Sequence, residues 1–190
     1  MRTDFRKTTF KTSCTSVADH PKDGLPAVLL LGRTNVGKST LINALTSQKL
    51  AFSSKKAGKT RLLNYFLVDE KFYLVDSPGY GSTSYATMNT IFFAGMTEDY
   101  VKDPSLKSIV LLLDLRRELG EDDKKFLVYL KKTGKKIILV LTKTDQMNQS
   151  ALHKAKTTAA SLGFTDMLLS DLKPASLEKI RSAIVTSVAG

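Results

Sequence analysis

The sequence has one cysteine, two histidines and no long apolar segment, and each shortage excludes a class of protein. Cys14 alone cannot form an internal disulfide, so we expect a reducing compartment. Apolar runs such as residues 109–113 fall far short of the roughly 20 residues of a transmembrane helix, so we expect no membrane span. His20 and His153 are too far apart in sequence to suggest a metal site.

Acidic residues are also scarce compared with basic ones. The 190-residue chain has 29 Lys and Arg against 18 Asp and Glu, which gives a net charge of +11. Such an excess favours a polyanionic partner, either nucleic acid or an anionic membrane surface, and does not choose between them. The remaining composition, 42% hydrophobic and 25% charged, is typical of a globular chain and excludes disordered and collagen-like ones.

Residues 1–24 lack a clear period and are basic and rich in Thr and Ser. No apolar core follows the basic start, so we do not expect a secretory signal. Two interpretations stay open: an organellar presequence, which places the protein in an organelle matrix, or an N-terminal strand at about residues 10–15 of a bacterial cytoplasmic protein. From residue 25 to residue 190 the pattern is regular and predicts one domain.

Short β-branched and Leu-rich runs alternate with longer helical segments after residue 25. The runs lie at residues 27–31, 109–113, 137–141 and 167–169. Such runs are typical of parallel strands covered on both faces, whereas residues 64–68 and 72–75 predict an antiparallel hairpin at an edge. We predict an α/β fold with a doubly wound, mostly parallel sheet, one antiparallel edge strand, and ligands at the carboxyl ends of its strands. A C-terminal helix is predicted to bury Leu177, Ile180, Ile184, Val185 and Val188.

A phosphate-binding loop follows the run at residues 27–31. Residues 32–39, GRTNVGKS, match G-x-x-x-x-G-K-[ST], in which glycines let several backbone N–H groups point at phosphate oxygens. The helix that begins near Lys38 adds the positive end of its dipole. Lys38 supplies a charge for the β- and γ-phosphates, and the Ser39 hydroxyl can bind Mg²⁺. The predicted phosphate contacts are Gly32, Arg33, Thr34, Asn35, Val36, Gly37, Lys38, Ser39 and Thr40.

Two further segments are predicted to face the γ-phosphate. In Asp76-Ser77-Pro78-Gly79, Asp76 is expected to hold Mg²⁺ through water, and the Gly79 N–H to reach the γ-phosphate. Thr60 is the candidate for a second Mg²⁺ hydroxyl ligand. It lies in the basic segment at residues 49–61, which either contacts a polyanion in a nucleotide-dependent way or forms a solvated loop that offsets the charge of the nucleotide.

The segment after residues 137–141 is predicted to select the base. In Thr142-Lys143-Thr144-Asp145, the Asp145 carboxylate can accept from the N1–H and N2 amine of guanine, and adenine offers neither donor. The stem of Lys143 can lie across the purine face. Ser170-Asp171 is either a backbone donor to guanine O6 or an ordinary turn. Together the motifs predict a three-layer P-loop, Ras-like G domain that binds GTP or GDP with Mg²⁺.

These motifs together resemble the EngB (YihA/YsxC) family of ribosome-biogenesis GTPases, of the TrmE-Era-EngA-EngB-Septin-like class. The likeness covers residues 10 to 183 and rests on GRTNVGKS, AGKTR at 57–61, DSPGYG at 76–81, DLR at 114–116, TKTD at 142–145 and LSD at 169–171. The family usually has Pro at Ala57, Lys at Gln146, Ser at Asp171 and His at Arg117. The resemblance implies an EngB-type G domain at residues 25–190, with Gly58 among the GTP contacts.

Hydrolysis is expected to depend on positioning and charge neutralisation, so we predict Lys38, Thr60 and Gly79 as the catalytic residues. Tyr80 stands where many GTPases have a water-orienting Gln, which predicts turnover of about 10⁻³ s⁻¹ or below. Asn35 either coordinates K⁺ beside the phosphates, as in related GTPases without that Gln, or caps the loop. Arg116 and Arg117 are predicted to form an ion-pair cluster, not a catalytic finger. The expected partners are Glu118, Glu121, Asp122 and Asp123.

The resemblance implies a monomeric assembly factor for the large ribosomal subunit, which binds its precursor or its rRNA and is linked to cell division and septation. The alternative is a small GTPase switch that protein effectors recognise, although the sequence has neither a prenylation cysteine nor a myristoylation glycine. A P-loop kinase or ATPase leaves Lys143 and Asp145 unexplained.

Overall fold

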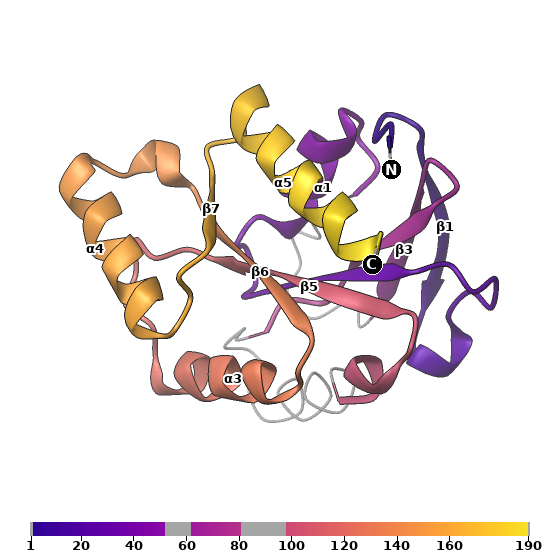
Figure 1. Ribbon diagram of the computed structural model, residues 1–190, viewed down its shortest axis with the longest axis horizontal. Coiled ribbons are helices and arrows are strands. Elements are labelled where there is room, and N and C mark those ends of the chain that lie inside the picture. The colour runs from indigo at the N-terminus through magenta and orange to yellow at the C-terminus, as the bar shows by residue number, and fades with distance from the viewer. Residues whose placement is uncertain (1, 52–61, 81–97, 190) are drawn as a thin grey trace.

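The computed structural model describes residues 2–51, 62–80 and 98–189, which form a three-layer α/β fold around a seven-stranded sheet (Figure 1). The strands are β1 (Thr8–Cys14), β2 (Ala27–Gly32), β3 (Leu63–Val68), β4 (Phe72–Asp76), β5 (Leu106–Leu113), β6 (Lys136–Thr142) and β7 (Met167–Ser170). Their order in the sheet is β1-β3-β4-β2-β5-β6-β7. Each run predicted as a strand after residue 25 lies inside one of these elements.

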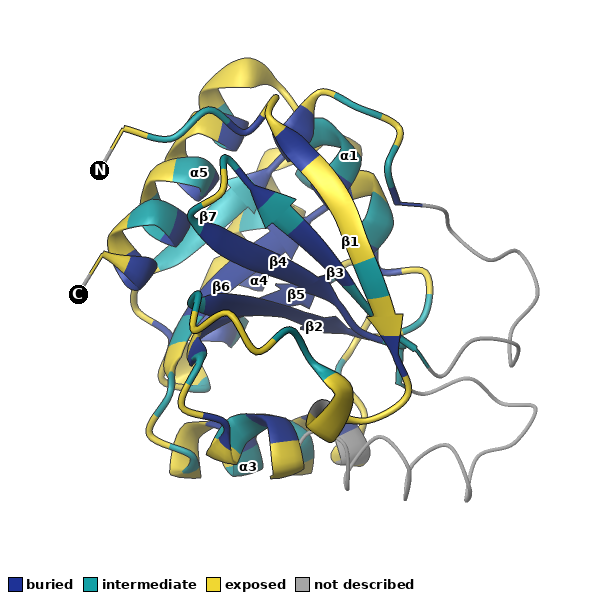
Figure 2. Cartoon of the chain, turned by 90° about the vertical axis from the view of Figure 1, so that its right-hand side faces the viewer, coloured by how far each residue is buried: buried dark blue, intermediate teal, exposed yellow. Residues whose placement is uncertain are grey.

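The sheet is mostly parallel, which confirms the predicted fold class. The pairs that β2 makes with β4 and β5 are parallel, as are β5 with β6 and β6 with β7. Only β3 runs the other way, because it pairs antiparallel with both β1 and β4. The predicted hairpin is present as β3 and β4, but β1 covers its outer side and takes the edge position (Figure 2).

Helices cover both faces of the sheet. They are α1 (Lys38–Thr46), α3 (Glu121–Lys132), α4 (Gln149–Ser161) and α5 (Pro174–Val188), with short 3-10 turns at Val17–Asp19 and Thr144–Gln146. Figure 1 shows α1 and α5 on one side of the sheet and α3 on the other. Within the described ranges, no helix combines the length and the apolar character that crossing a membrane requires.

The continuous apolar runs follow from these two covered faces. Along β2, Leu29 and Leu31 pack into the core on the α3 and α4 side, whereas Val28 and Leu30 pack into the core on the α1 and α5 side. Both sets are fully buried, as the dark central strands of Figure 2 show. Burying one such side chain stabilises the fold by about 2 kcal/mol, so neither face of β2 tolerates a polar residue cheaply.

The C-terminal helix buries the face that its spacing predicts. Leu177, Ile180, Ile184 and Val188 are buried in the same core as α1, and Val185 packs at its margin. Ser187 is also buried, and its hydroxyl is hydrogen-bonded to that of Ser108 on β5, 2.7 Å away.

Candidate nucleotide site

The carboxyl ends of neighbouring strands bring the predicted motifs to one edge of the sheet. Leu30 of β2 is paired in register with Asp76 of β4, and Gly32 with Leu112 of β5. On the other side, Thr142 of β6 is paired with Ser170 of β7. The phosphate loop, the 76–79 segment, the 142–145 segment and Ser170 therefore follow adjacent strands, as expected for a ligand site of this fold class.

The two motif glycines of the phosphate loop, Gly32 and Gly37, are required for different physical reasons. Gly37, which precedes α1, has a φ of 111°, a conformation that side chains disfavour. At Gly32, a Cβ atom would lie 2.7 Å from Val36 Cγ1 and 2.9 Å from the Leu112 carbonyl oxygen, so the close packing of loop and strand excludes a side chain. Val36 itself is buried beneath the loop, whereas Thr40 is exposed on α1.

Lys38 places its ammonium group inside the loop. The residue is 8% exposed, and Nζ donates to the carbonyl oxygens of Gly32 at 3.1 Å and Arg33 at 3.3 Å. Burial lowers the pKa of Lys38, and the negative charge of Asp76 opposes that shift. A buried cation whose direct partners are neutral carbonyls favours an anion beside it, which fits a phosphate.

Ser39 and Asp76 form the oxygen pair predicted for Mg²⁺. Ser39 Oγ donates to Asp76 Oδ2 at 3.1 Å, and the second carboxylate oxygen, Oδ1, is buried without a hydrogen-bond partner among the described residues. Burial raises the pKa of Asp76, whereas Lys38 and the Ser39 hydroxyl lower it. Ser77 Oγ donates to the Leu30 carbonyl at 2.6 Å and holds the segment against β2. A hydroxyl and a carboxylate with an unused oxygen suit Mg²⁺, so these residues fit the ion.

Gly79 lies directly against the phosphate loop. A Cβ atom on it would be 2.6 Å from Thr34 Cα and 2.7 Å from Thr34 N, so a side chain here would displace the loop. The next residue continues the contact, because the Thr34 amide donates to the Tyr80 carbonyl at 2.9 Å and the Tyr80 amide to the Gly32 carbonyl at 3.4 Å. The end of the 76–79 segment and the phosphate loop are thus coupled through their backbones.

The base-selecting segment reaches the phosphate loop as well. Lys143 has a φ of 57°, and its Nζ donates to the Asn35 carbonyl at 3.1 Å while it pairs with Asp114 Oδ2 at 3.1 Å. Asp145 lies exposed in the 3-10 turn Thr144–Gln146, and its side chain makes no hydrogen bond or ion pair among the described residues. Thr142 is buried, and its hydroxyl donates to the Leu113 carbonyl at 3.4 Å. Asp145 is therefore available to a ligand, while Lys143 and Thr142 are held by the protein.

Asp171 is held by the start of α5. Its Oδ1 accepts from the Lys173 amide at 3.0 Å and from Ser176 Oγ at 2.6 Å. The Ser176 hydroxyl and the Lys173 amide lower the pKa of this carboxyl. Ser170 is buried at the end of β7. The side chain of Asp171 therefore orders the turn into α5 and is not free to contact a base.

Two arginines have partners that the sequence did not indicate. Arg33 Nη1 pairs with the buried Asp123 of α3 at 2.8 Å, and the Gly120 amide donates to the same carboxylate at 3.0 Å. The predicted cluster around Arg116 is wrong in its partners: Arg116 pairs with Asp114 at 2.7 Å. Asp114 directly follows the β5 run, so the rule that ligand residues follow strand ends would have identified it. Asp123, which was expected beside Arg116 and Arg117, pairs with Arg33 instead, and nothing in the sequence indicated that contact.

Part of the predicted site lies outside the described residues. Gly58 and Thr60 belong to residues 52–61, as do most of the basic positions of the 49–61 segment. The described part of that segment includes Lys49, which is exposed.

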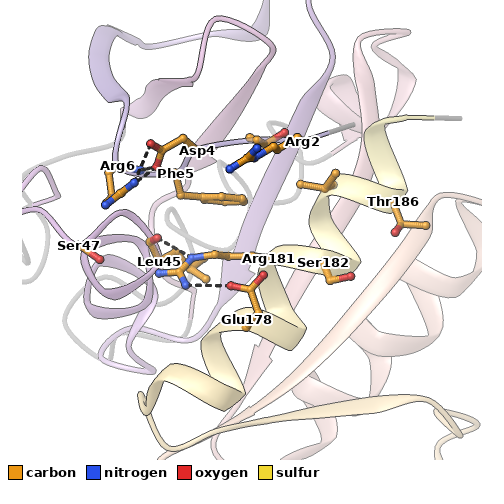
Figure 3. Close-up of a pocket in the computed structure, with 12 residues that line it drawn as sticks. Arg2, Asp4, Phe5, Arg6, Leu45, Ser47, Glu178, Arg181, Ser182 and Thr186 are labelled. Atoms are coloured by element: carbon orange, nitrogen blue, oxygen red, sulfur yellow. Dashed lines mark hydrogen bonds and ion pairs between the residues drawn. The ribbon is translucent and has the colours of Figure 1, made fainter.

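A cavity of about 490 Å³ lies away from this edge, at the opposite end of α1 from the phosphate loop (Figure 3). Four of its charged side chains are paired. Arg181 donates to the Leu45 carbonyl at 2.9 Å and to Glu178 at 3.3 Å, and Arg6 pairs with Asp4 at 3.0 Å. The contact between Arg181 and Leu45 attaches α5 to the end of α1.

Sequence comparisons place this chain among known GTP-binding proteins. Residues 27–143 match a family model described as 50S ribosome-binding GTPase. The "Probable GTP-binding protein EngB" of Lactobacillus helveticus is 39% identical over 151 residues, which cover 78% of this chain and 77% of the relative. The protein of the same name from Solibacter usitatus is 40% identical over 173 residues, 88% of this chain and 89% of the relative.

Solved structures share the fold. A crystal structure of a probable GTP-binding protein engB superposes with a TM-score of 0.67 at 19% identity, over 86% of this chain and 98% of that one. Era, in complex with MgGDPNP and nucleotides 1506–1542 of 16S ribosomal RNA, gives a TM-score of 0.63 at 23% identity, over 86% of this chain and 57% of that one. At such identities the structures establish the architecture, and the sequence matches establish the family. The chain belongs to the EngB family of GTP-binding proteins.

Proposed function

We propose that this protein binds and slowly hydrolyses GTP with Mg²⁺, and that the bound nucleotide controls its action as an assembly factor for the large ribosomal subunit. One observation carries the nucleotide part of the proposal. The buried Lys38 ammonium, the Ser39–Asp76 pair and the exposed Asp145 carboxylate lie along one edge of the sheet. Their chemistry matches a phosphate, a divalent cation and guanine respectively.

The phosphate end of the site needs no covalent step from the protein. Lys38 and the loop amides would bind the phosphate oxygens, and the close approach of Gly79 to Thr34 places the 76–79 segment beside the loop. Ser39 and Asp76 would hold Mg²⁺, the second of them through water, with Thr60 as a further hydroxyl ligand. When bound, the ion neutralises charge that develops on the β- and γ-phosphate oxygens.

Slow turnover follows from Tyr80. Its ring packs against that of Phe126 on α3, with centroids 4.9 Å apart, which directs the side chain toward the core. The residue is therefore a poor substitute for a Gln that orients water. K⁺ beside Asn35 is the proposed compensation; Asn35 has a φ of 63°, which turns the loop there. Equal hydrolysis rates in K⁺ and Na⁺ would contradict a role for K⁺.

A ribosomal particle is the partner that the charge and the family support best. The family model is described as 50S ribosome-binding GTPase, and the net charge of +11 favours a polyanion. We place the G domain at residues 25–190 and propose a monomer in the bacterial cytoplasm, with an organelle matrix as the alternative. The link to cell division and septation rests on the family.

Sedimentation with purified large subunits tests this proposal. The protein is mixed with the subunits in the presence of a non-hydrolysable GTP analogue or of GDP, at two salt concentrations. Binding should require the analogue and weaken with salt, with a logarithmic slope of about −0.7 to −0.9 for each phosphate neutralised. A Lys38→Ala variant is the matched control, because it should bind subunits equally weakly with either nucleotide.

The alternative function, a switch that protein effectors recognise, predicts a different result. Nucleotide binding would be intact, but co-sedimentation would be absent with both nucleotides or would not change with salt. That outcome would remove the ribosomal part of the proposal and leave the nucleotide site unaffected.

A further inference from the structure

Asp114 joins two cations at the end of β5. Its carboxylate accepts from Arg116 Nη2 at 2.7 Å and from Arg116 Nε at 2.8 Å, and it pairs with Lys143 Nζ at 3.1 Å. The side chain of Asp114 is 13% exposed. The Arg116 guanidinium, and then Lys143, hold the pKa of Asp114 at about 2, so the carboxylate stays charged at every physiological pH.

The third donor of Arg116 reaches the base-selecting turn. Arg116 Nη1 donates to Gln146 Oε1, and Gln146 directly follows Asp145. The backbone N–H of Gln146 donates to the backbone carbonyl of Lys143 at 3.1 Å. The turn that contains Asp145 is therefore held at both ends by the same Asp114–Arg116 pair: at Lys143 through the carboxylate and at Gln146 through the guanidinium.

The backbone of this turn needs such support. Lys143 has a φ of 57°, a left-handed backbone conformation that residues other than glycine adopt only where the surrounding structure stabilises it. Its ammonium group is held by Asp114 and by the Asn35 carbonyl of the phosphate loop. The contacts therefore determine both the position of Lys143 and the place from which Asp145 faces the base.

Because Nε, Nη1 and Nη2 of Arg116 all donate to acceptors of the protein, the guanidinium is engaged away from the phosphates. We propose that Arg116 is a positioning residue for guanine recognition, which with Asp114 holds Lys143 and the Asp145 turn in their binding arrangement. This inference rests on the proposed guanine site. The residue does not touch the base; it acts through Gln146 and Asp114. A lysine could not replace it, because an ammonium group lacks the planar fork that contacts both partners.

Arg116→Gln tests the proposal, and Arg117→Gln is the matched control. Arg117 is adjacent, exposed and without an ion pair among the described residues, so the control changes the same charge. Affinities for GDP, IDP and ADP are measured by calorimetry, together with the melting temperature of the nucleotide-free protein. IDP lacks the N2 amine, so the ratio of GDP to IDP affinity reports how well Asp145 is placed.

We expect Arg116→Gln to weaken GDP about tenfold and to lower the GDP-to-IDP ratio, while Arg117→Gln changes neither. Gln146→Ala, which leaves the Asp114–Arg116 pair intact, should lower the same ratio. The double variant Arg116→Gln/Gln146→Ala should lose little more than Arg116→Gln alone, because Arg116→Gln already breaks the Arg116–Gln146 contact that Gln146→Ala removes.

Two results would overturn the positioning role. The first is an Arg116→Gln variant that keeps the GDP affinity and the ratio of Arg117→Gln. The second is an equal loss for GDP, IDP and ADP with a lower melting temperature, accompanied by an unchanged ratio in Gln146→Ala. If the wild-type protein itself binds GDP no better than ADP, the guanine site is wrong and the positioning role fails with it.

Discussion

The Ser39 hydroxyl donates to the Asp76 carboxylate at 3.1 Å, although 37 positions separate the two residues in the chain. One belongs to the first turn of α1 and the other ends β4, and the parallel pairing of β2 with β4 brings them together. The contact leaves Asp76 Oδ1 buried without a partner among the described residues, which is the arrangement expected where a cation completes the site.

Ser39→Ala should reduce the dependence of nucleotide affinity on Mg²⁺. The change removes one oxygen ligand, so we expect the affinity for GDP in Mg²⁺ to fall about tenfold while the affinity in EDTA stays the same. Fluorescence titration with and without EDTA measures both values. Thr157→Ala on α4 removes a hydroxyl elsewhere and should change neither value. A parallel loss in EDTA would contradict the assignment to Mg²⁺.

Gly79→Ala should weaken the binding of GTP more than the binding of GDP. The new Cβ would lie 2.6 Å from Thr34 Cα, so the loop must shift near the γ-phosphate. We expect a non-hydrolysable GTP analogue to bind at least about tenfold more weakly and GDP to change less. Gly120→Ala is the control, because its Cβ would make only an ordinary contact at 3.6 Å with Asp123. Equal losses of affinity for both nucleotides would show that Gly79 does not act through the γ-phosphate.

Asp145→Asn should change the base that is bound. A carboxylate accepts from both the N1–H and N2 amine of guanine, whereas an amide donates to the carbonyl that xanthine has at position 2. We expect GDP affinity to fall by at least about a hundredfold and XDP affinity to rise. Competition between GDP and XDP for the variant measures the change. Continued preference for GDP would show that another residue selects the base.

Arg33→Gln should leave GDP binding almost unchanged. The Arg33 side chain is 52% exposed and pairs with Asp123 on α3, so its loss should alter GDP affinity by less than about twofold and stability by at most about 1 kcal/mol. Asp123→Ala should destabilise more, by about 1–3 kcal/mol, because it also removes the acceptor of the Gly120 amide. Urea denaturation and calorimetry test both. A large loss of GDP affinity in Arg33→Gln would show that the Arg33 guanidinium contacts the nucleotide.

Asp114 should make the free energy of unfolding depend on pH in the acidic range. The pKa of this group is lowered from 3.8 to about 2 in the folded protein, so the folded state binds the proton less tightly than the unfolded state does. Its contribution is therefore present above pH 4 and is lost as the pH falls toward 2. We expect Asp114→Asn to lose about 2 kcal/mol at pH 7 and progressively less below pH 4. Asp166→Asn, an exposed change, is the control. A pH-independent loss would exclude the titration of Asp114 as its cause.

Much of the fold could be predicted because strands and loops are determined by neighbours in the chain. The runs at 27–31 and 137–141 lie inside β2 and β6, since a strand buried on both faces needs continuous apolar residues. The prediction missed the start of β5, where Ser108 interrupts the apolar pattern. That serine can be buried without an unpaired hydroxyl, because Ser187 of α5, 79 positions away, forms a hydrogen bond with it.

The sequence by itself determined the conformation of the loop at residues 32–39, because its glycines, Lys38 and the start of α1 are adjacent in the backbone. It also determined the mostly parallel sheet and the order of motifs along its carboxyl edge. Only the tertiary structure decided which charges meet. Arg33 pairs with Asp123, which lies 90 positions away in the chain. Arg116 contacts Asp114 and Gln146 and makes no ion pair with the described acidic side chains that follow it in sequence. Several acids lie close to Arg116 in the chain, whereas Arg33 has none within nine positions. The packing of α3 and of the 142–145 turn against the strand ends brings each arginine to its partner.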